Sequence, residues 1–394
     1  MSIATKMAGF IESSSWIRKM FEEGARLKSI HGKDNVYDFS LGNPSLDPPG
    51  EFRRYLKSIV DNETPGIHAY MPNTGYAHVR KAVAELVARE QGGLSLGEDD
   101  VIMTCGAAGG LNIILKAILN PGDEVITPAP YFVEYGFYAD NHGGTLVPVK
   151  TKDDFNLDID AIERAITPKT KAVLINSPNN PTGQVYPEAD LVMLGDLLRE
   201  KSSKNGNIIY LVSDEPYRKI TYDGITVPSV LKCFNNSIIA TSYSKDLSIP
   251  GERIGYVAVC PDADDKPMLV QAMALANRIL GFVNAPALMQ RVVGGLQGVH
   301  VDVAEYARKR DLLCNGLADT GYRFVRPAGA FYLFPQSPVA DEVVFVRALQ
   351  EERILAVPGS GFGAPGYFRL SYCVDDRTIN GALPGFERVF QQFA

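Results

Sequence analysis

One lysine follows a run of residues that is typical of a buried strand. Residues 238–241 are apolar or β-branched, and they lead directly into Ser242, a tyrosine, Ser244 and Lys245. Burial at the end of such a strand lowers the pKa of a lysine, because desolvation disfavours the charged amine. A neutral lysine amine can form a Schiff base with an aldehyde cofactor. The two serines and Arg253 could bind the phosphate of that cofactor. Taken alone the pattern is short, and a chance match on a surface loop is the alternative, so its weight depends on the rest of the chain.

Three further loops of unusual composition follow other predicted strands. They are residues 106–108, 179–183 and 214–217, after the strands at 101–104, 172–176 and 208–212. In open α/β sheets, ligands bind beyond the carboxyl ends of the strands. The small residues at 106–108 would also let an anion approach the backbone N–H groups at a helix start. Together with the Lys245 loop, these loops predict a single cleft.

The elements that must position these loops alternate between strand and helix. Such alternation predicts an α/β fold with a mainly parallel sheet. Helices are expected at residues 8–30, with a break at 13–15, at 52–60, and at 111–119 after a small-residue turn at 106–110. Helical stretches at 287–320 and 339–352 then flank strand-like residues at 330–334. The chain is therefore expected to contain a large domain at 48–285 and a smaller α+β domain at 286–394.

Composition and charge argue against several classes of function. The net charge of −7 and the lack of a Lys/Arg run disfavour binding to nucleic acid or to a membrane surface. Five widely spaced cysteines without a Cys-x-x-Cys pair, and histidines without ligand spacing, disfavour a disulfide framework and a metal site. The start of the chain lacks the apolar core of a signal peptide, so a cytoplasmic protein is expected. A dinucleotide-dependent oxidoreductase is disfavoured because the glycine fingerprint is absent.

In their order along the chain, these motifs resemble those of the class I/II pyridoxal-phosphate aminotransferases of the aspartate aminotransferase family. The resemblance extends from about residue 42 to 369 and rests on Tyr70, the Asn-Pro-Thr-Gly sequence at 180–183, Asp214, Tyr217, Ser242, Ser244, Lys245 and Arg253. It implies fold type I, in which the N-terminal segment (1–47) joins the C-terminal segment in the small domain. It also implies pyridoxal 5'-phosphate as the cofactor and a homodimer with shared active sites.

The resemblance assigns most of these residues to the cofactor. Lys245 would carry the Schiff base and move protons, and Asp214 would keep the pyridine nitrogen protonated. Tyr217 and Asn180 would hydrogen-bond the phenolic oxygen of the cofactor. The stacking aromatic is expected to be Phe132, with Tyr131 as the alternative. The phosphate would be bound by Gly106, Ala107, Ala108, Ser242, Arg253 and, from the neighbouring subunit, Tyr70. A helix cap is the alternative reading of Asp214.

The resemblance also implies how the substrate is bound. Arg369 would hold the α-carboxylate through its guanidinium fork, Asn180 would lie beside that carboxylate, and Gly42 would lie on the segment that closes the site. Arg18 and Arg278 are the two candidates for binding a side-chain carboxylate, and a solvated surface charge is the alternative for each. Aspartate and 2-oxoglutarate are therefore the expected substrates. Aromatic or other neutral amino acids, or a β-elimination reaction, are the alternatives.

Overall fold

A mainly parallel sheet forms the centre of the larger part of the molecule. The computed structural model describes residues 2–12, 16–62 and 64–393, and within these residues the sheet has seven strands in the order β2-β8-β7-β6-β5-β3-β4. The strands are β2 (Val101–Thr104), β3 (Glu124–Ala129), β4 (Thr145–Lys150), β5 (Thr170–Asn176), β6 (Tyr210–Asp214), β7 (Ser237–Ser242) and β8 (Gly255–Val259). Strand β8 is antiparallel to β2 and β7, and the other neighbours are parallel. The carboxyl ends of the parallel strands therefore meet at one edge, as predicted.

Helices cover both faces of this sheet, which explains why its central strands are apolar throughout. In β7, Ile238 and Ala240 pack in the core that α5 (Gly106–Ile118) and α10 (Lys266–Ile279) share, whereas Ile239 packs in the core on the other face. The second face is covered by α4 (Ala77–Glu90), α8 (Glu188–Asn205) and α11 (Ala287–Gly294). The shorter helices α6 (Glu134–Asn141), α7 (Ile159–Ala165) and α9 (Val230–Cys233) connect the strands.

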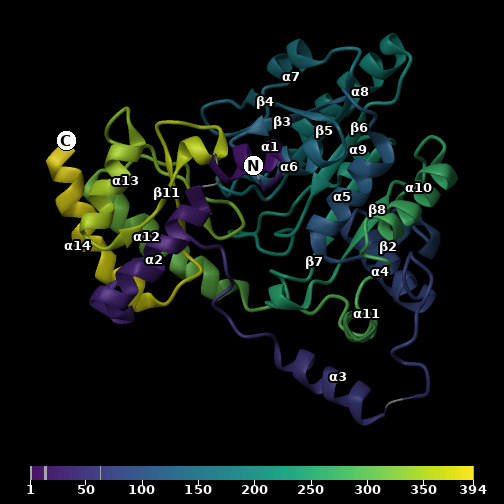
Figure 1. Ribbon diagram of the computed structural model, residues 1–394, viewed down its shortest axis with the longest axis horizontal. Coiled ribbons are helices and arrows are strands. Elements are labelled where there is room, and N and C mark those ends of the chain that lie inside the picture. The colour runs from purple at the N-terminus through teal and green to yellow at the C-terminus, as the bar shows by residue number, and fades with distance from the viewer. Residues whose placement is uncertain (1, 13–15, 63, 394) are drawn as a thin grey trace.

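A second, smaller core joins the two ends of the chain (Figure 1). Its helices are α2 (Trp16–His31), α12 (Val303–Thr320), α13 (Glu342–Glu351) and α14 (Asp376–Phe393). Strand β1 (Tyr37–Asp38) pairs with β10 (Ile354–Leu355), and β12 (Phe368–Ser371) lies between β11 (Val357–Pro358) and β9 (Tyr332–Leu333). Phe39 packs against Phe386 with ring centroids 5.9 Å apart. This is the smaller α+β unit built from both chain ends.

Two helices begin or end elsewhere than the sequence predicts. Residues 106–110 are the first turn of α5 rather than a turn before it. A Cβ on Gly110 would lie 3.0 Å from Val257, so the small residue allows the helix to pack closely on the sheet. The helical stretch predicted at 287–320 is two helices, α11 and α12. The break predicted at 13–15 lies outside the described residues.

Helix α11 also bears on the boundary between the two parts. Met289, Val292 and Leu296 pack in the large core, and the small core begins again at Val301. We therefore propose that the second boundary lies between Leu296 and Val301, beyond the residue 286 suggested by the sequence.

Two helices near the N-terminus lie at the periphery of the molecule. Helix α1 (Thr5–Glu12) contacts α6, where the Phe10 and Phe137 rings meet edge-on at 4.9 Å and Lys6 pairs with Asp140 at 2.5 Å. Helix α3 (Gly50–Asp61) lies at the edge of the molecule in Figure 1, where Phe52, Leu56 and Ile59 pack against the large core, although none of its residues is buried. None of the helices in the described ranges is both long enough and apolar enough to cross a membrane.

Candidate active site

A cavity of about 280 Å³ lies at the carboxyl edge of the large sheet, and residues of β9 and β12 line it from the small core. It brings together most of the residues singled out in the sequence, which are Gly42, Ala107, Ala108, Phe132, Asn180, Asp214, Tyr217, Ser242, Lys245, Arg253 and Arg369. It is also lined by Tyr332, Tyr138, Leu111, Asn176, Ser244, Pro216 and Pro250. The residues come from segments far apart in the sequence and from both cores, so the cavity exists only in the folded chain.

Lys245 follows β7 and extends into this cavity. Its Nζ donates a hydrogen bond of 2.8 Å to the carbonyl oxygen of Gly42. Burial lowers the pKa of Lys245 to about 8, and the positive charges of Arg253 and Arg369 act in the same direction. A substantial fraction of the amine is therefore neutral just above neutral pH, as a nucleophile or a proton acceptor requires.

Asp214 ends β6 with one carboxylate oxygen bound and the other free. Tyr135 donates to Oδ2 at 2.7 Å, whereas Oδ1 is buried without a hydrogen-bond partner among the described residues. Burial raises the pKa of Asp214 to about 7, and the neighbouring charge of Glu215 adds to the rise. Residues 216–219 form turns, so Asp214 does not cap a helix. A buried acceptor without a donor is costly, and the protonated nitrogen of a pyridine ring would supply that donor.

Arg369 lies deep in the small core, on β12. Its Nη1 donates to Asn180 Oδ1 at 3.0 Å, and its Nη2 donates to the carbonyl oxygen of Ser40 at 2.6 Å. The guanidinium lies between the rings of Tyr332 and Phe362, each with its centroid 4.7 Å away. Burial lowers the pKa of Arg369, and its Nε–H has no partner in the described part of the chain. A carboxylate entering the cavity would offer charged acceptors to this fork.

The start of α5 forms the opposite end of the cavity. Gly106 has φ +73°, and a Cβ on it would lie 2.9 Å from Nη2 of Arg253. Gly106 therefore lies behind the cavity wall and allows Arg253 to approach the helix start. Ala107 and Ala108 in the first helical turn and Ser242 line the same end. Backbone N–H groups at a helix start, an arginine and a hydroxyl group are a set that binds phosphate.

Some of the predicted residues lie elsewhere. The Tyr70 side chain is 91% exposed on a loop outside the cavity. Arg278 is exposed on the last turn of α10, and the side chain of Arg18, on α2, lies outside the described residues. Phe132 lines the cavity, whereas Tyr131 packs beside Gly363. No group of three or more His, Cys, Asp or Glu residues in the described ranges could hold a metal ion.

Comparison with known proteins shows which family has this arrangement. The family described as aminotransferase class I and II matches residues 34–384. The chain belongs to this family. It is 36% identical over 359 residues to an aspartate/prephenate aminotransferase of Thermus thermophilus, covering 89% of this chain and 90% of the relative. It is 30% identical over 388 residues to aromatic-amino-acid aminotransferase 2 of Thermococcus litoralis, covering 96% of each.

Solved structures agree with this assignment. An aminotransferase of Eubacterium rectale superposes with a TM-score of 0.96 at 41% identity, covering 100% of this chain and 99% of that chain. The aspartate aminotransferase of Thermus thermophilus with maleate gives a TM-score of 0.85 at 30% identity, covering 99% of this chain and 100% of that chain. The protein is therefore a pyridoxal-phosphate-dependent aminotransferase of the aspartate aminotransferase family, with fold type I.

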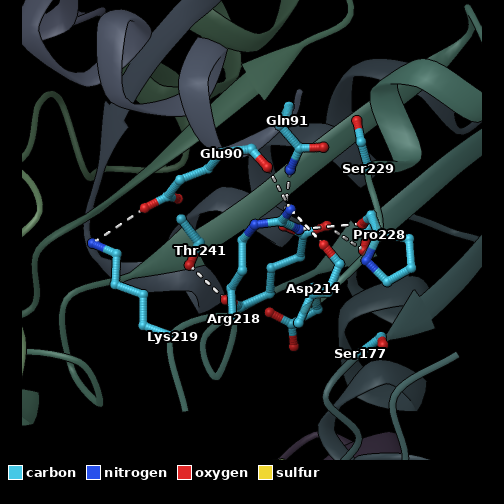
Figure 2. Close-up of polar contacts among 12 residues, drawn as sticks. Glu90, Gln91, Ser177, Asp214, Arg218, Lys219, Pro228, Ser229 and Thr241 are labelled. Atoms are coloured by element: carbon cyan, nitrogen blue, oxygen red, sulfur yellow. Dashed lines mark hydrogen bonds and ion pairs between the residues drawn. The ribbon is translucent and has the colours of Figure 1, made fainter. Parts of the chain in front are cut away.

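Behind the cavity, the aminotransferase has a network of buried charges. Arg218 pairs with Glu215 at 3.0 Å and donates to the carbonyl oxygens of Glu90 and Val227 at 2.9 and 2.8 Å. Lys219 lies 3.7 Å from Glu90 and 3.3 Å from Asp246. Figure 2 shows Asp214 beside this network, with its carboxylate directed away from the Arg218 guanidinium. Glu215 directly follows Asp214, and Asp246 directly follows Lys245, so the network anchors both loops from behind.

Three contributions to the site were missed in the sequence. Tyr332 lies in a run of apolar residues that resembles a core strand, and its hydroxyl gave no separate signal. Tyr135 lies three residues beyond Phe132, and helical spacing could have placed the two on one face. The acidic residues after Asp214 and Lys245 are visible in the sequence, but their partners come from α4 and from a turn.

Proposed function

We propose that this aminotransferase transfers the amino group of aspartate to 2-oxoglutarate, with pyridoxal phosphate held on Lys245. One observation supports the proposal above the others: three groups with unmet chemistry surround one cavity. They are Oδ1 of Asp214, the amine of Lys245 with its lowered pKa, and Nε–H of the buried Arg369; in the described part of the chain, this oxygen and this N–H have no hydrogen-bond partner. A pyridine nitrogen, an aldehyde and a substrate α-carboxylate would satisfy them in turn.

The residues of the cavity fit this cofactor. When bound, pyridoxal phosphate supplies a ring that accepts negative charge from the substrate Cα. Asp214 would hold the proton on the ring nitrogen, while Tyr217 and Asn180 would donate to the phenolic oxygen. Lys245 would remove and return the proton at the substrate Cα. Phe132 would lie against the ring, and the phosphate would bind at Ala107, Ala108, Ser242 and Arg253.

The choice of amino acid depends on a cation that this cavity does not contain. Among the described lining residues, the cations are Lys245, Arg253 and Arg369, and each already has a role. Ala108 offers no charge. A distal carboxylate would therefore be bound by a residue from outside, and Arg278 and Arg18 are the candidates. The names of relatives support both donor classes, aspartate in the Thermus thermophilus protein and aromatic amino acids in the Thermococcus litoralis protein.

The exposed Tyr70 supports a dimer with shared sites. Asn73, in the same loop, donates from Nδ2 to the carbonyl oxygen of Val283 at 2.6 Å, and Asn277 donates to the Asn73 carbonyl at 2.8 Å. The Tyr70 loop is thereby fixed to the end of α10 that carries Arg278. We infer that both residues reach the cavity of a second subunit, where Tyr70 would contact the phosphate and Arg278 the substrate side chain.

Unpaired cysteines favour the cytoplasm as the location. All five cysteines fall within the described residues, and all five are free thiols. Free thiols are typical of proteins in reducing compartments. A cell fractionation that recovers the activity with cytosolic marker enzymes would test this location.

Substrate choice is tested by comparing kcat/KM for aspartate and for phenylalanine. Arg278→Ala or Arg18→Ala should cost about 2–5 kcal/mol of transition-state binding for aspartate and little for phenylalanine, because only aspartate has a distal carboxylate. Arg164 is exposed on α7, so Arg164→Ala is the control and should change kcat/KM for neither substrate. If neither Arg278→Ala nor Arg18→Ala alters the ratio, both arginines are surface charges. Pyruvate and ammonia released without an oxo acid would favour β-elimination.

The shared site is tested by mixing two inactive or weakened variants. Tyr70→Phe and Lys245→Ala damage different halves of one shared site. A mixed dimer then has one site that contains neither change, so a random mixture should recover roughly a quarter of the wild-type activity. A fully active monomer in analytical ultracentrifugation would contradict the proposal.

A further inference from the structure

Tyr332 connects the two halves of the cavity. It lies on β9 and pairs in register with Ser371 of β12, the strand that also carries Arg369. Its ring faces the Arg369 guanidinium, and only 3% of the residue is exposed. A Cβ on Gly42 would lie 1.9 Å from the Tyr332 hydroxyl, so the N-terminal segment closes directly over it. Its position is therefore fixed from three sides.

The hydroxyl of Tyr332 lies 2.8 Å from the hydroxyl of Tyr217. Burial raises the pKa of Tyr332 to about 12 and the pKa of Tyr217 well above its usual value, so both keep their protons at neutral pH. The charged and titratable groups that act on this pair are Arg369 from β12, Asp214 from β6 and Cys373 after β12. Lys245 lines the same cavity.

Two neutral hydroxyls share one proton in the bond between them and leave the other proton free. If Tyr217 donated to Tyr332, its single proton would be used and it could not donate into the cavity. Within the described residues, Tyr217 is the one hydrogen-bond partner recorded for the Tyr332 hydroxyl, and the guanidinium above the ring cannot accept. When Tyr332 is the donor, the Tyr217 proton is free, and accepting a bond makes Tyr217 a stronger donor.

We propose that Tyr332 is a positioning residue that donates to Tyr217 and thereby directs the Tyr217 proton at the phenolic oxygen of the cofactor. This inference rests on the proposed function, which gives that oxygen to Tyr217. Negative charge on the phenolic oxygen is stabilised by the Tyr217 bond, and this stabilisation makes the nitrogen of the Lys245–cofactor link less basic. Tyr332 would thus tune the link without touching the cofactor.

The test is to load the protein with pyridoxal phosphate and to follow the absorbance of the Lys245–cofactor link against pH. The midpoint of this titration reports how basic the nitrogen of the link is. Tyr332→Phe keeps the ring against Arg369 and removes the hydroxyl, so the pH midpoint should move upward by about 0.5–1 unit. Tyr217→Phe should move it at least as far. The double variant should match Tyr217→Phe alone, because Tyr332 acts through Tyr217.

Tyr372→Phe is the matched control. The Tyr372 hydroxyl is also buried and lies 3.3 Å from a second tyrosine hydroxyl, that of Tyr222, but neither residue lines the cavity. Its midpoint should equal that of the wild type. Succinate is a dicarboxylate that would bind to Arg369. The affinity of Tyr332→Phe for succinate should stay close to the wild-type value, because the ring that faces Arg369 remains.

Several outcomes would overturn the inference. The inference fails while the proposed function stands if the absorbance of the wild type titrates normally and Tyr332→Phe has the same pH midpoint. It fails in the same way if Tyr332→Phe still moves the midpoint when Tyr217 is already replaced by Phe. It also fails if the affinity for succinate falls together with the change in pH midpoint, since that result indicates that the side chains around Arg369 have repacked. A wild type with no borohydride-reducible link to Lys245 would overturn the proposed function and this inference together.

Discussion

The loops after β6 and β7 each carry one residue that faces the cavity and a neighbour that faces the opposite way. On the cavity side, one oxygen of Asp214 has no hydrogen-bond partner within the described residues, and the Lys245 amine donates to a backbone carbonyl. On the opposite side, Glu215 has Arg218, Ser213 and Gln91 as partners, and Asp246 has Lys219. The charged groups on the cavity side thus lack a charged partner in the described part of the chain, whereas those on the opposite side form ion pairs.

This difference indicates how the molecule tolerates an unsatisfied site. Buried groups without partners destabilise the fold, and they persist only where the surrounding structure holds them in place. Here the holding contacts come from the adjacent residues of the same two loops, through charge-assisted hydrogen bonds in a buried network. We therefore expect substitutions on the cavity side to act on catalysis and substitutions behind it to act on stability.

The largest effect is expected from a comparison of two lysines. Lys245→Ala should remove the borohydride-reducible link to the cofactor and lower kcat by at least roughly 10³-fold, because proton transfer at the substrate Cα is lost. Lys219→Ala, in the network behind, should keep the link. Peptide mapping after borohydride reduction identifies the labelled lysine. Labelling at any position other than Lys245 would refute the assignment.

Asp214→Ala should lower kcat by several orders of magnitude while the cofactor remains bound. Without the carboxylate, the pyridine nitrogen loses its proton and the ring accepts charge poorly. An N-methylated cofactor analogue carries that charge permanently and should restore part of the rate. Failure of the analogue to restore any activity, with cofactor bound, would indicate a structural role for Asp214.

Glu215→Gln is expected to act mainly on stability. It leaves the partly buried Arg218 guanidinium without its charged partner, which should lower the free energy of unfolding by about 2–4 kcal/mol. Urea unfolding of the cofactor-free protein measures this change. Glu188→Gln, at the exposed start of α8, is the control and should have little effect. If Glu215→Gln lowered kcat as far as Asp214→Ala does, the expected difference between the cavity side and the opposite side would be wrong.

The smallest effect is a change in how stability depends on pH. The pKa of Asp214 is raised to about 7, so its contribution to the stability of the cofactor-free protein is complete below about pH 4 and is lost as the pH rises through 7. Asp214→Asn cannot ionise, so its Tm relative to wild type should increase by a few degrees between pH 5 and pH 8. Asp319 is exposed on α12, so the Tm of Asp319→Asn should run parallel to that of the wild type over this pH range. A parallel curve for Asp214→Asn would contradict the raised pKa.

Much of this architecture could be predicted because parallel sheets obey a simple rule. Strand-end loops converge, so Lys245, Asp214 and Asn180 could be placed together before any coordinates were known. The rule covers one sheet edge only. Tyr332 comes from a different core, and its approach to Tyr217 depends on how the two cores pack.

Other features depend on packing distances or on a second subunit. The start of α5 was misplaced because glycines at 106, 109 and 110 suggest a turn, although they permit close packing within the molecule. The partners of Tyr70 and Arg278 cannot be deduced from one chain, because both side chains point outward in it. Spacing alone could not choose between Arg18 and Arg278.

The pairing of β1 with β10 has a consequence for synthesis on the ribosome. Tyr37 is paired with Ile354, so the segment that carries Gly42 cannot take its final position until β10 has been synthesised. At about 5–20 residues per second, the delay is roughly 15–60 s. The strands of the large sheet, between residues 101 and 259, are all made within that delay. We therefore expect the nascent chain to display an open sheet edge first, with Gly42, Tyr332 and Arg369 closing over it only after Arg369 has been synthesised.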